Sequence, residues 1–298
     1  MIKAYTSPGQ ELHNPSFEIY EYGQSIPYYE SPLRLQTLLQ ELPKDGLIEI
    51  INSKPATSEQ LTCHTSDYLS FLESIFEKWR RESPSDAERF GSLFPVSHRP
   101  TNAHNESNSI PALLGTFVKD LSAPITSNTW QASLASAGCA LSGANTLVEN
   151  LGLLNKNVVL SLNRPPGHHA GSANCAGYCY INNAALAATK LASHGRVSIL
   201  DIDYHAGNGT QQIFYENSNI DVCSIHADPS NEYPYFAGFA SETGAGAGIG
   251  HHHNVPLPHG TQPHIYTQAL MRSLDWLSKS GPSMLVLSAG FDTYRKDP

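Results

Sequence analysis

Three side chains of metal-ligand type follow one short apolar run of the sequence. The run Val197–Ile202 is typical of a buried strand, and Asp201, Asp203 and His205 come at its end, each two residues apart. Alternate residues of a strand point to the same face of a sheet. Three such groups on one side of a strand end are costly to bury unless something pairs with them. The spacing therefore favours a bound cation.

A second apolar run, Met284–Ser288, is followed by Asp292. Asp203, His205 and Asp292 form one candidate zinc site, because two carboxylates and an imidazole leave an open position for water, as catalytic zinc requires. Each also has an ordinary structural explanation: a turn cap for Asp203, a hydrogen-bonded core residue for His205 and a loop residue for Asp292. Their shared place just beyond apolar strands favours the metal site.

Two adjacent histidines lie in the turn Arg164–Ala170, which reads RPPGHHA. Beside a metal, His168 and His169 could divide the work of a general base and a general acid. As surface loop residues they would need no such role. Asp201 and Asn208 could orient the two rings, and a charged and a neutral partner would give the rings different pKa values.

Two other patterns carry less chemistry. TGAGAGIG at 243–250 looks like a dinucleotide-binding loop, but its glycines alternate and HHHNVPLP follows instead of a helix. We expect a flexible glycine loop there. The internal triplet His251–His253 could bind nickel or zinc adventitiously, without a catalytic role.

From Thr129 onward, strand-like and helix-like segments alternate, which predicts an α/β fold. We expect a single domain, 1–298, of the three-layer α/β/α type, with a parallel β-sheet sandwiched by helices. Ligands bind such sheets at the carboxyl ends of the strands, where RPPGHHA, DIDYHAGNG, SIHADP and SAGFD follow one strand after another. Residues 83–128 are predicted to be a loop-rich insertion at the rim of the site or in an oligomer contact. The predicted helices are 67–82, 130–150, 181–193, one from 210 and 264–279, and the predicted strands are 158–162, 197–202, 222–225 and 284–288.

The composition excludes several classes of protein. With 298 residues, 40% apolar and 15% charged, the chain is normal for a globular enzyme. No apolar run approaches the ~20 residues that span a bilayer, and the first residues lack the core of a signal peptide. We therefore expect a cytoplasmic protein without a membrane partner. Five scattered cysteines fit reduced thiols, and a net charge of -9 without a basic block argues against nucleic acid as a partner.

Taken together, the motifs resemble the arginase/deacetylase fold, and specifically the histone deacetylase family. Within that family the sequence is most similar to the bacterial acetylpolyamine amidohydrolases, over nearly the whole chain. The family motifs are RPPGHHA (164–170), GYCYINNAALAA (177–188), LDIDYHAGNGTQ (200–211) and SAGFD (288–292). The closer likeness rests on CHTSDYLSFLE (63–73), FPV (94–96), HADPSNEYPYFAGFASETGAGAG (226–248) and DTYRKDP (292–298).

The resemblance implies a zinc-dependent amidohydrolase that removes acetyl groups from small acetylated amines or from acetyl-lysine. The zinc would polarise the acetamide carbonyl and its bound water. A homodimer, in which the insertion narrows the partner's tunnel, is also implied. The implied roles are zinc ligation by Asp203, His205 and Asp292; general-base catalysis by His169, supported electrostatically by His168; orientation of both by Asp201 and Asn208; substrate contacts by Gly177, Tyr178, Tyr235 and Phe236; and a structural potassium ion at Asp201, Asp203, His205, Ser224 and Ile225.

Two departures from the family pattern stand out. The family's catalytic tyrosine lies in a Gly-Gly-Tyr loop after a further strand, and Tyr294 is too close to Asp292 to replace it. We therefore expect the chain to be truncated, with that tyrosine beyond Pro298. In the acetylpolyamine enzymes, acidic residues of the insertion help to read the cationic amine; here Pro111 falls at one such position, and Glu106 is nearby.

Two other functions remain open at this point. A non-catalytic ligand-binding homologue would keep the ligands without the tyrosine. A binuclear manganese ureohydrolase would share the fold, but it needs more acidic ligands than the single aspartate of SAGFD supplies.

Overall fold

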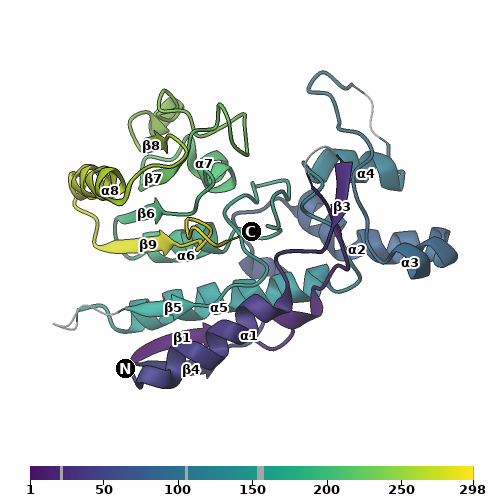
Figure 1. Ribbon diagram of the computed structural model, residues 1–298, viewed down its shortest axis with the longest axis horizontal. Coiled ribbons are helices and arrows are strands. Elements are labelled where there is room, and N and C mark those ends of the chain that lie inside the picture. Colours follow the sequence, from purple (N-terminus) through teal and green to yellow (C-terminus); the bar gives the residue numbers. More distant parts are fainter. Residues whose placement is uncertain (21–22, 105–106, 153–157, 298) are drawn as a thin grey trace. The chain divides into compact units, whose positions relative to one another are not determined.

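The computed structural model describes residues 1–20, 23–104, 107–152 and 158–297. The chain divides into two compact units, Met1–Asn183 and Ala184–Pro298. Both contain parallel strands and helices, so the predicted α/β class is confirmed (Figure 1). The single domain of residues 1–298 stays a prediction. None of the helices in the described ranges is long and apolar enough to cross a membrane.

The strands are β1 (Ile2–Thr6), β2 (Glu18–Tyr20), β3 (Gln24–Ile26), β4 (Ile48–Asn52), β5 (Val159–Ser161), β6 (Val197–Asp201), β7 (Ile220–Ala227), β8 (His252–Leu257) and β9 (Met284–Ser288). The α-helices are α1 (Pro32–Glu41), α2 (Ser66–Glu82), α3 (Pro84–Phe90), α4 (Ile110–Phe117), α5 (Thr129–Glu149), α6 (Asn183–Ala192), α7 (Asn208–Phe214) and α8 (Pro263–Ser278).

The first unit is built on a parallel sheet with the strand order β4-β1-β5, and it also contains the antiparallel pair β2–β3. Ala4 of β1 packs with Leu35 of α1 on one face of the sheet. The next residue, Tyr5, points the other way, and its hydroxyl lies 2.5 Å from Thr146 Oγ1 of α5. Since neighbouring strand residues face opposite sides, α1 and α5 cover opposite faces. The small residues of α5 allow close contact: a Cβ at Gly138 would lie 2.1 Å from the carbonyl oxygen of Lys54.

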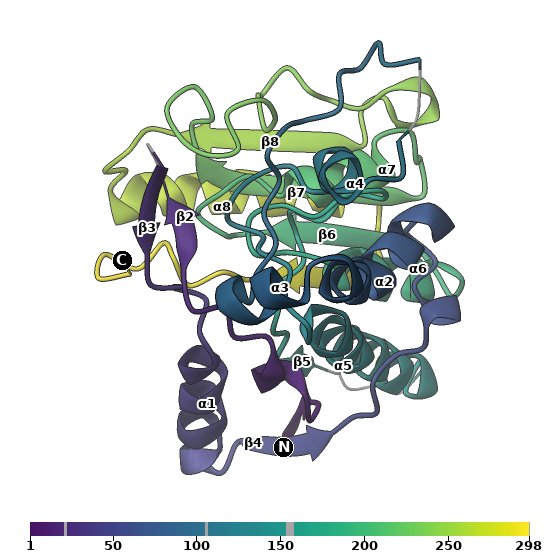
Figure 2. The same cartoon turned by 90° about the vertical axis from the view of Figure 1, so that its right-hand side faces the viewer.

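The second unit is built on a parallel sheet with the strand order β8-β7-β6-β9. Figure 2 shows β8, β7 and β6 side by side. His253 of β8 stacks on Trp276 of α8, with ring centroids 5.1 Å apart. The ring of the preceding residue, His252, bonds instead to the carbonyl oxygen of Phe214, where α7 ends. The two helices therefore cover opposite faces, and the sheet carries the site on its strand ends.

Sequence patterns located most elements from Thr129 onward, but they missed others. They missed β1 and β4, and also β8, which runs through the histidine triplet and contains Pro256. Proline is tolerated there because β8 is an edge strand. The predicted insertion 83–128 contains two short helices, α3 and α4, each with proline in its first turn. Proline suits that position because the first helical N–H groups have no partner within the helix.

Candidate metal centre and histidine pair

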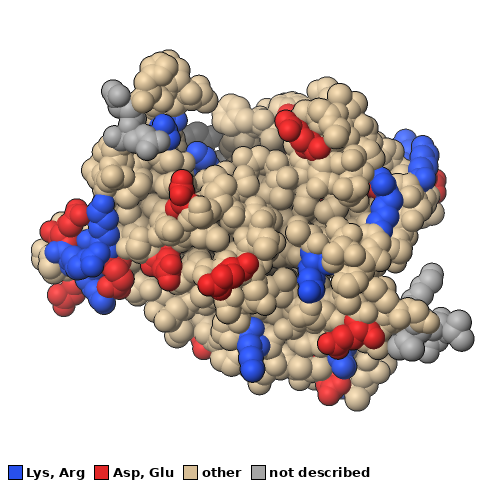
Figure 3. All heavy atoms as spheres, turned by 180° about the vertical axis from the view of Figure 1, so that it is seen from behind, with Lys and Arg blue, Asp and Glu red and all other residues tan. Residues whose placement is uncertain are grey.

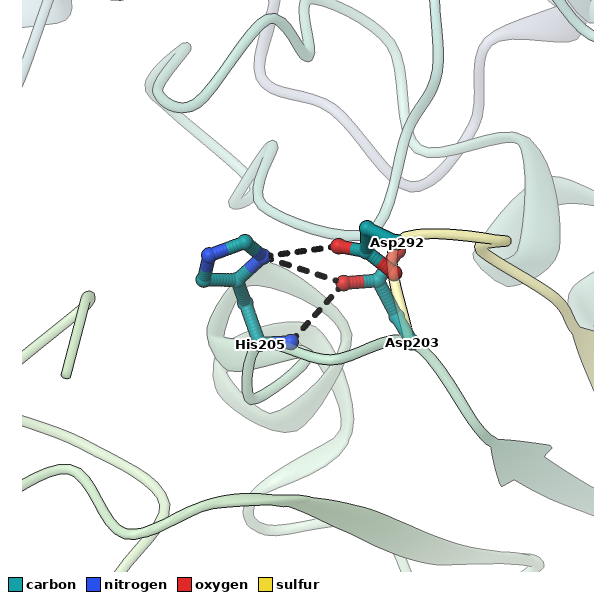
Figure 4. Close-up of side chains that lie close together, drawn as sticks. All are labelled: Asp203, His205 and Asp292. Atoms are coloured by element: carbon teal, nitrogen blue, oxygen red, sulfur yellow. Dashed lines mark hydrogen bonds and ion pairs between the residues drawn. The ribbon is translucent and has the colours of Figure 1, made fainter. Parts of the chain in front are cut away.

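The carboxyl end of β6 places two of the predicted ligands. Asp201 is the last residue of the strand, and its Oδ1 accepts a hydrogen bond from the backbone N–H of Asp203 (3.1 Å). Asp203 Oδ1 in turn accepts the backbone N–H of His205 (2.9 Å). These two hydrogen bonds fix the turn before α7 begins at Asn208. They direct Asp203 and His205 to the same side (Figure 4).

Asp292 arrives from the turn after β9, the neighbour of β6 in the sheet. Its Oδ1 accepts the backbone N–H of Tyr204 (3.0 Å), and its Oδ2 lies 3.0 Å from His205 Nδ1. The same ring nitrogen lies 3.3 Å from Asp203 Oδ1. One ligand atom from each of the three residues lies within 4.8 Å of the others. The structure thus brings together the three predicted ligands.

The charges of this cluster favour a cation. Burial alone would lower the pKa of His205, but hydrogen bonds and charges from Asp203 and Asp292 outweigh it and raise that pKa to about 10. The two carboxylates therefore draw positive charge onto the ring nitrogen. A metal ion bound at the same nitrogen would be stabilised by the same two carboxylates in place of a proton. Two carboxylates and one imidazole are a donor set that zinc accepts with a position left open.

Gly290 is a residue of this centre that sequence reasoning missed. A Cβ at this position would lie 1.9 Å from Asp203 Oδ2 and 2.8 Å from Asp292 Oδ1. Only glycine therefore lets the two carboxylates approach each other. The available signal was its place within SAGFD, between the strand and the aspartate.

The tandem histidines lie in the first unit, after β5. The rings of His168 and His169 are 3.9 Å apart between centroids, and both residues are buried. Burial rules out the alternative of surface loop histidines. Three side chains hold the turn: Ser136 Oγ (2.8 Å) and Asn183 Nδ2 (3.3 Å) donate to the carbonyl oxygen of Pro165, and Asn182 Nδ2 donates to that of Ala170 (3.0 Å).

Arg164 anchors the start of the same turn and was also missed. The side chain is only 2% exposed. Its guanidinium donates to the carbonyl oxygens of Gln10 (2.6 Å), His13 (2.6 Å) and Glu30 (2.7 Å). Its Nε lies 3.1 Å from Glu30 Oε2. Burial raises the pKa of Glu30 to about 7, although the neighbouring guanidinium opposes the rise.

The predicted substrate contacts lie on two segments with an uncommon backbone. Tyr178 (φ 64°) and Tyr235 (φ 62°) are the non-glycine residues with positive φ among those described. Such strain tends to cluster at functional sites. Gly177 donates its N–H to Asp120 Oδ2 (2.9 Å), while Phe236 projects from its segment with 91% of its surface exposed.

The remaining predicted residues are placed as follows. Ser224 and Ile225 lie in β7, where Ser224 is the register partner of Asp201. Pro111 lies in the first turn of α4, and Glu106 falls outside the described residues.

Comparisons of sequence and of structure with known proteins point to the same family. The histone deacetylase domain family matches residues 28–298. Acetylpolyamine amidohydrolase 1 of Pseudomonas aeruginosa is 38% identical over 301 residues, covering 100% of this chain and 84% of the relative. The acetylpolyamine amidohydrolase of Mycoplana ramosa is 35% identical over 300 residues, covering 100% and 85%. The crystal structure of an acetylpolyamine aminohydrolase from Burkholderia pseudomallei matches with a TM-score of 0.92 at 33% identity, covering 100% of this chain and 84% of that one.

Proposed function

Since the chain belongs to the histone deacetylase family, we propose that it is a zinc-dependent deacetylase that hydrolyses the amide bond of small acetylated amines. Acetylated polyamines are the preferred substrate class, because relatives named acetylpolyamine amidohydrolases match over the whole length of this chain. Acetyl-lysine is the second class. The observation that carries the proposal is the convergence of Asp203, His205 and Asp292 on one point.

Asp203, His205 and Asp292 would hold the zinc ion. When bound, the ion would polarise the acetamide carbonyl and lower the pKa of a water molecule at its open position. The backbone N–H of Tyr204 donates to Asp292, and that of His205 donates to Asp203, so both carboxylates are oriented before a metal binds. This fixed geometry limits the reorganisation needed on binding.

The proton transfers are assigned to the histidine pair. His169 would take the proton from the attacking water, and His168 would support the developing charge. One of the two rings then protonates the leaving amine. Asp201 and Asn208 are assigned to orienting these rings, which fixes the tautomer each ring presents.

The other parts of the proposal concern binding and partners. Gly177, Tyr178, Tyr235 and Phe236 would contact the substrate chain. A potassium ion at Asp201, Asp203, His205, Ser224 and Ile225 would stabilise the strand ends. The face in Figure 3 carries acidic and basic side chains interspersed, unlike the basic surfaces that bind nucleic acid. A homodimer and a cytoplasmic location complete the proposal.

The test is acetate release from an N-acetylated diamine and from an acetyl-lysine peptide. We expect hydrolysis by the wild-type protein that a chelator abolishes and zinc restores. We expect His169→Ala to lower kcat by roughly 10²–10⁴-fold, the usual contribution of general acid–base catalysis. A wild-type protein that binds zinc but releases no acetate would instead favour the non-catalytic ligand-binding homologue.

A further inference from the structure

The segment Tyr233–Gly238 of the second unit presents two aromatic side chains to solvent. Tyr235 is 41% exposed and Phe236 is 91% exposed. The ring of Tyr233 meets that of the proposed ligand His205 edge-on, with centroids 5.8 Å apart. Exposed rings cannot hold a backbone in place by burial. Polar contacts at the Gly238 end of the segment therefore contribute to holding it in place.

Gly238 closes the segment, and both of its backbone polar groups are held. Its carbonyl oxygen accepts a hydrogen bond from His226 Nε2 (2.8 Å), and its N–H donates to Glu242 Oε2 (2.7 Å). His226 lies on β7 and is 2% exposed. Because Nε2 donates to a carbonyl, Nδ1 is the acceptor, and the hydroxyl of Ser224 donates to it (2.7 Å). The ring is thus held at both nitrogens, by Ser224 of the sheet and by Gly238 of the segment.

Glu242 connects Gly238 to the rest of the unit. Besides the N–H of Gly238, Glu242 Oε2 accepts the N–H of Phe239 (3.2 Å) and the side-chain amide of Gln211 (2.9 Å). Gln211 lies on α7, and its Oε1 accepts the side-chain amide of Asn254 of β8 (2.7 Å). Hydrogen bonds to a charged acceptor are the stronger kind. The carboxylate therefore ties the segment to a helix and to a strand.

The contact at Gly238 is also close to the metal centre. Gly238 has φ +100°, and a Cβ there would lie 2.5 Å from Cβ of Ala206 and 2.8 Å from His226 Nε2. Ala206 directly follows His205 in the chain. The segment is therefore seated on the residue next to a proposed zinc ligand, with no space for a side chain in between.

We propose that His226 and Glu242 are positioning residues that hold Gly238 and so fix Tyr233, Tyr235 and Phe236 for contact with the substrate chain. The inference rests on the proposed function, because it concerns substrate contact. The two residues act through the segment and touch no reacting atom. Their loss changes substrate binding more than the chemical step, since the zinc ligands are held by separate backbone bonds.

Glu242→Ala and the conservative Glu242→Gln test the proposal. Glu242→Ala should raise KM for an N-acetylated diamine roughly tenfold, the equivalent of one charged hydrogen bond, with kcat changed less than about threefold. Glu242→Gln keeps an acceptor oxygen and should restore KM to within about twofold. His226→Gln serves as the second variant if Glu242→Ala does not fold.

Asp221→Asn is the matched control. Asp221 also has a buried carboxylate that accepts several bonds, from Arg196 (3.1 Å) and His251 (2.7 Å), but it lies at the opposite end of β7. This variant should lose stability without a change in KM. If Glu242→Ala behaves in the same way, the carboxylate has a merely structural role and the proposal is overturned.

A second readout does not depend on activity. Chymotrypsin cleaves after aromatic residues, so the rate of cleavage at Tyr235 and Phe236 reports how firmly the segment is held. We expect Glu242→Ala to be cut there roughly tenfold faster than the wild type, in line with the loss of one charged hydrogen bond, and Asp221→Asn to be cut at the wild-type rate. Equal cleavage in all three proteins overturns the positioning role. Faster cleavage in a protein without deacetylase activity would instead refute the proposed function alone.

Discussion

The two segments that carry the predicted substrate tyrosines share a backbone conformation but are held differently. Tyr178 is half-buried in the first unit, where its ring meets Tyr28 at 5.4 Å, and burial together with the nearby carboxylate of Glu18, itself fully buried, raises the pKa of Tyr178. Tyr235 lies exposed on a segment of the second unit that is fastened at Gly238. One aromatic contact is therefore part of a core, and the other is presented from a loop. Substitutions in the first should cost stability, and substitutions in the second should cost substrate binding.

The largest expected effect breaks the buried polar core of the first unit. Arg164→Ala leaves three carbonyl oxygens without their donor and Glu30 without its ion-pair partner. Removing one partner of a buried ion pair costs about 3–5 kcal/mol, so urea unfolding should show a loss of this size. The control is Arg80→Ala, because the ion pair of Arg80 with Glu77 lies at the surface, with side chains 60% and 47% exposed. Exposed ion pairs contribute roughly 0–1 kcal/mol; equal losses in the two variants would contradict this comparison.

A second prediction concerns the pH dependence of stability. A histidine in each unit makes stability change with pH, in opposite directions. In the first unit, burial and then the charge of Arg164 lower the pKa of His13 from 6.5 to about 3. Between these values the unfolded chain binds a proton that the folded chain does not, so stability falls as pH decreases from 6.5, by about 1.4 kcal/mol per pH unit. In the second unit, the carboxylates raise the pKa of His205 to about 10. In metal-free protein its contribution is therefore complete below pH 6.5 and is lost as pH rises toward 10.

The pH prediction is measured as a difference between variants. Urea unfolding across pH, in chelator, should show a shallower decline below pH 6.5 for His13→Asn than for the wild type. His205→Gln should show a shallower decline above pH 6.5. A His13→Asn profile parallel to the wild type throughout would mean that this buried histidine does not couple protonation to folding.

The smallest expected effects compare the two tyrosines directly. Tyr178→Phe removes a half-buried hydroxyl near the buried carboxylate of Glu18, which should lower the free energy of unfolding by about 1 kcal/mol. Tyr235→Phe removes a hydroxyl from an exposed side chain and should change it by less than about 0.5 kcal/mol. Chemical unfolding of both variants measures the difference. A loss for Tyr235→Phe as large as that for Tyr178→Phe would show that both segments are core structures.

The sequence was sufficient to predict those features of the site that depend on local spacing along the chain. Asp203 and His205 follow β6 directly, and Asp292 follows β9, so the carboxyl ends of two adjacent parallel strands bring them together. The strands β1 and β4 were missed because Lys3 and Glu49 interrupt their apolar pattern. Arg164, Gly290 and His226 were missed because their roles depend on contacts made only in the fold, such as the carbonyl oxygens that surround Arg164.

The most direct test of the account is the metal content of the purified protein, measured by elemental analysis beside Asp203→Ala and the control Asp221→Asn. The account predicts about one zinc ion per chain in the wild type and in Asp221→Asn, and none in Asp203→Ala. Zinc that persists in Asp203→Ala, or a pair of manganese ions in the wild type, would contradict the assignment of a single zinc site to Asp203, His205 and Asp292.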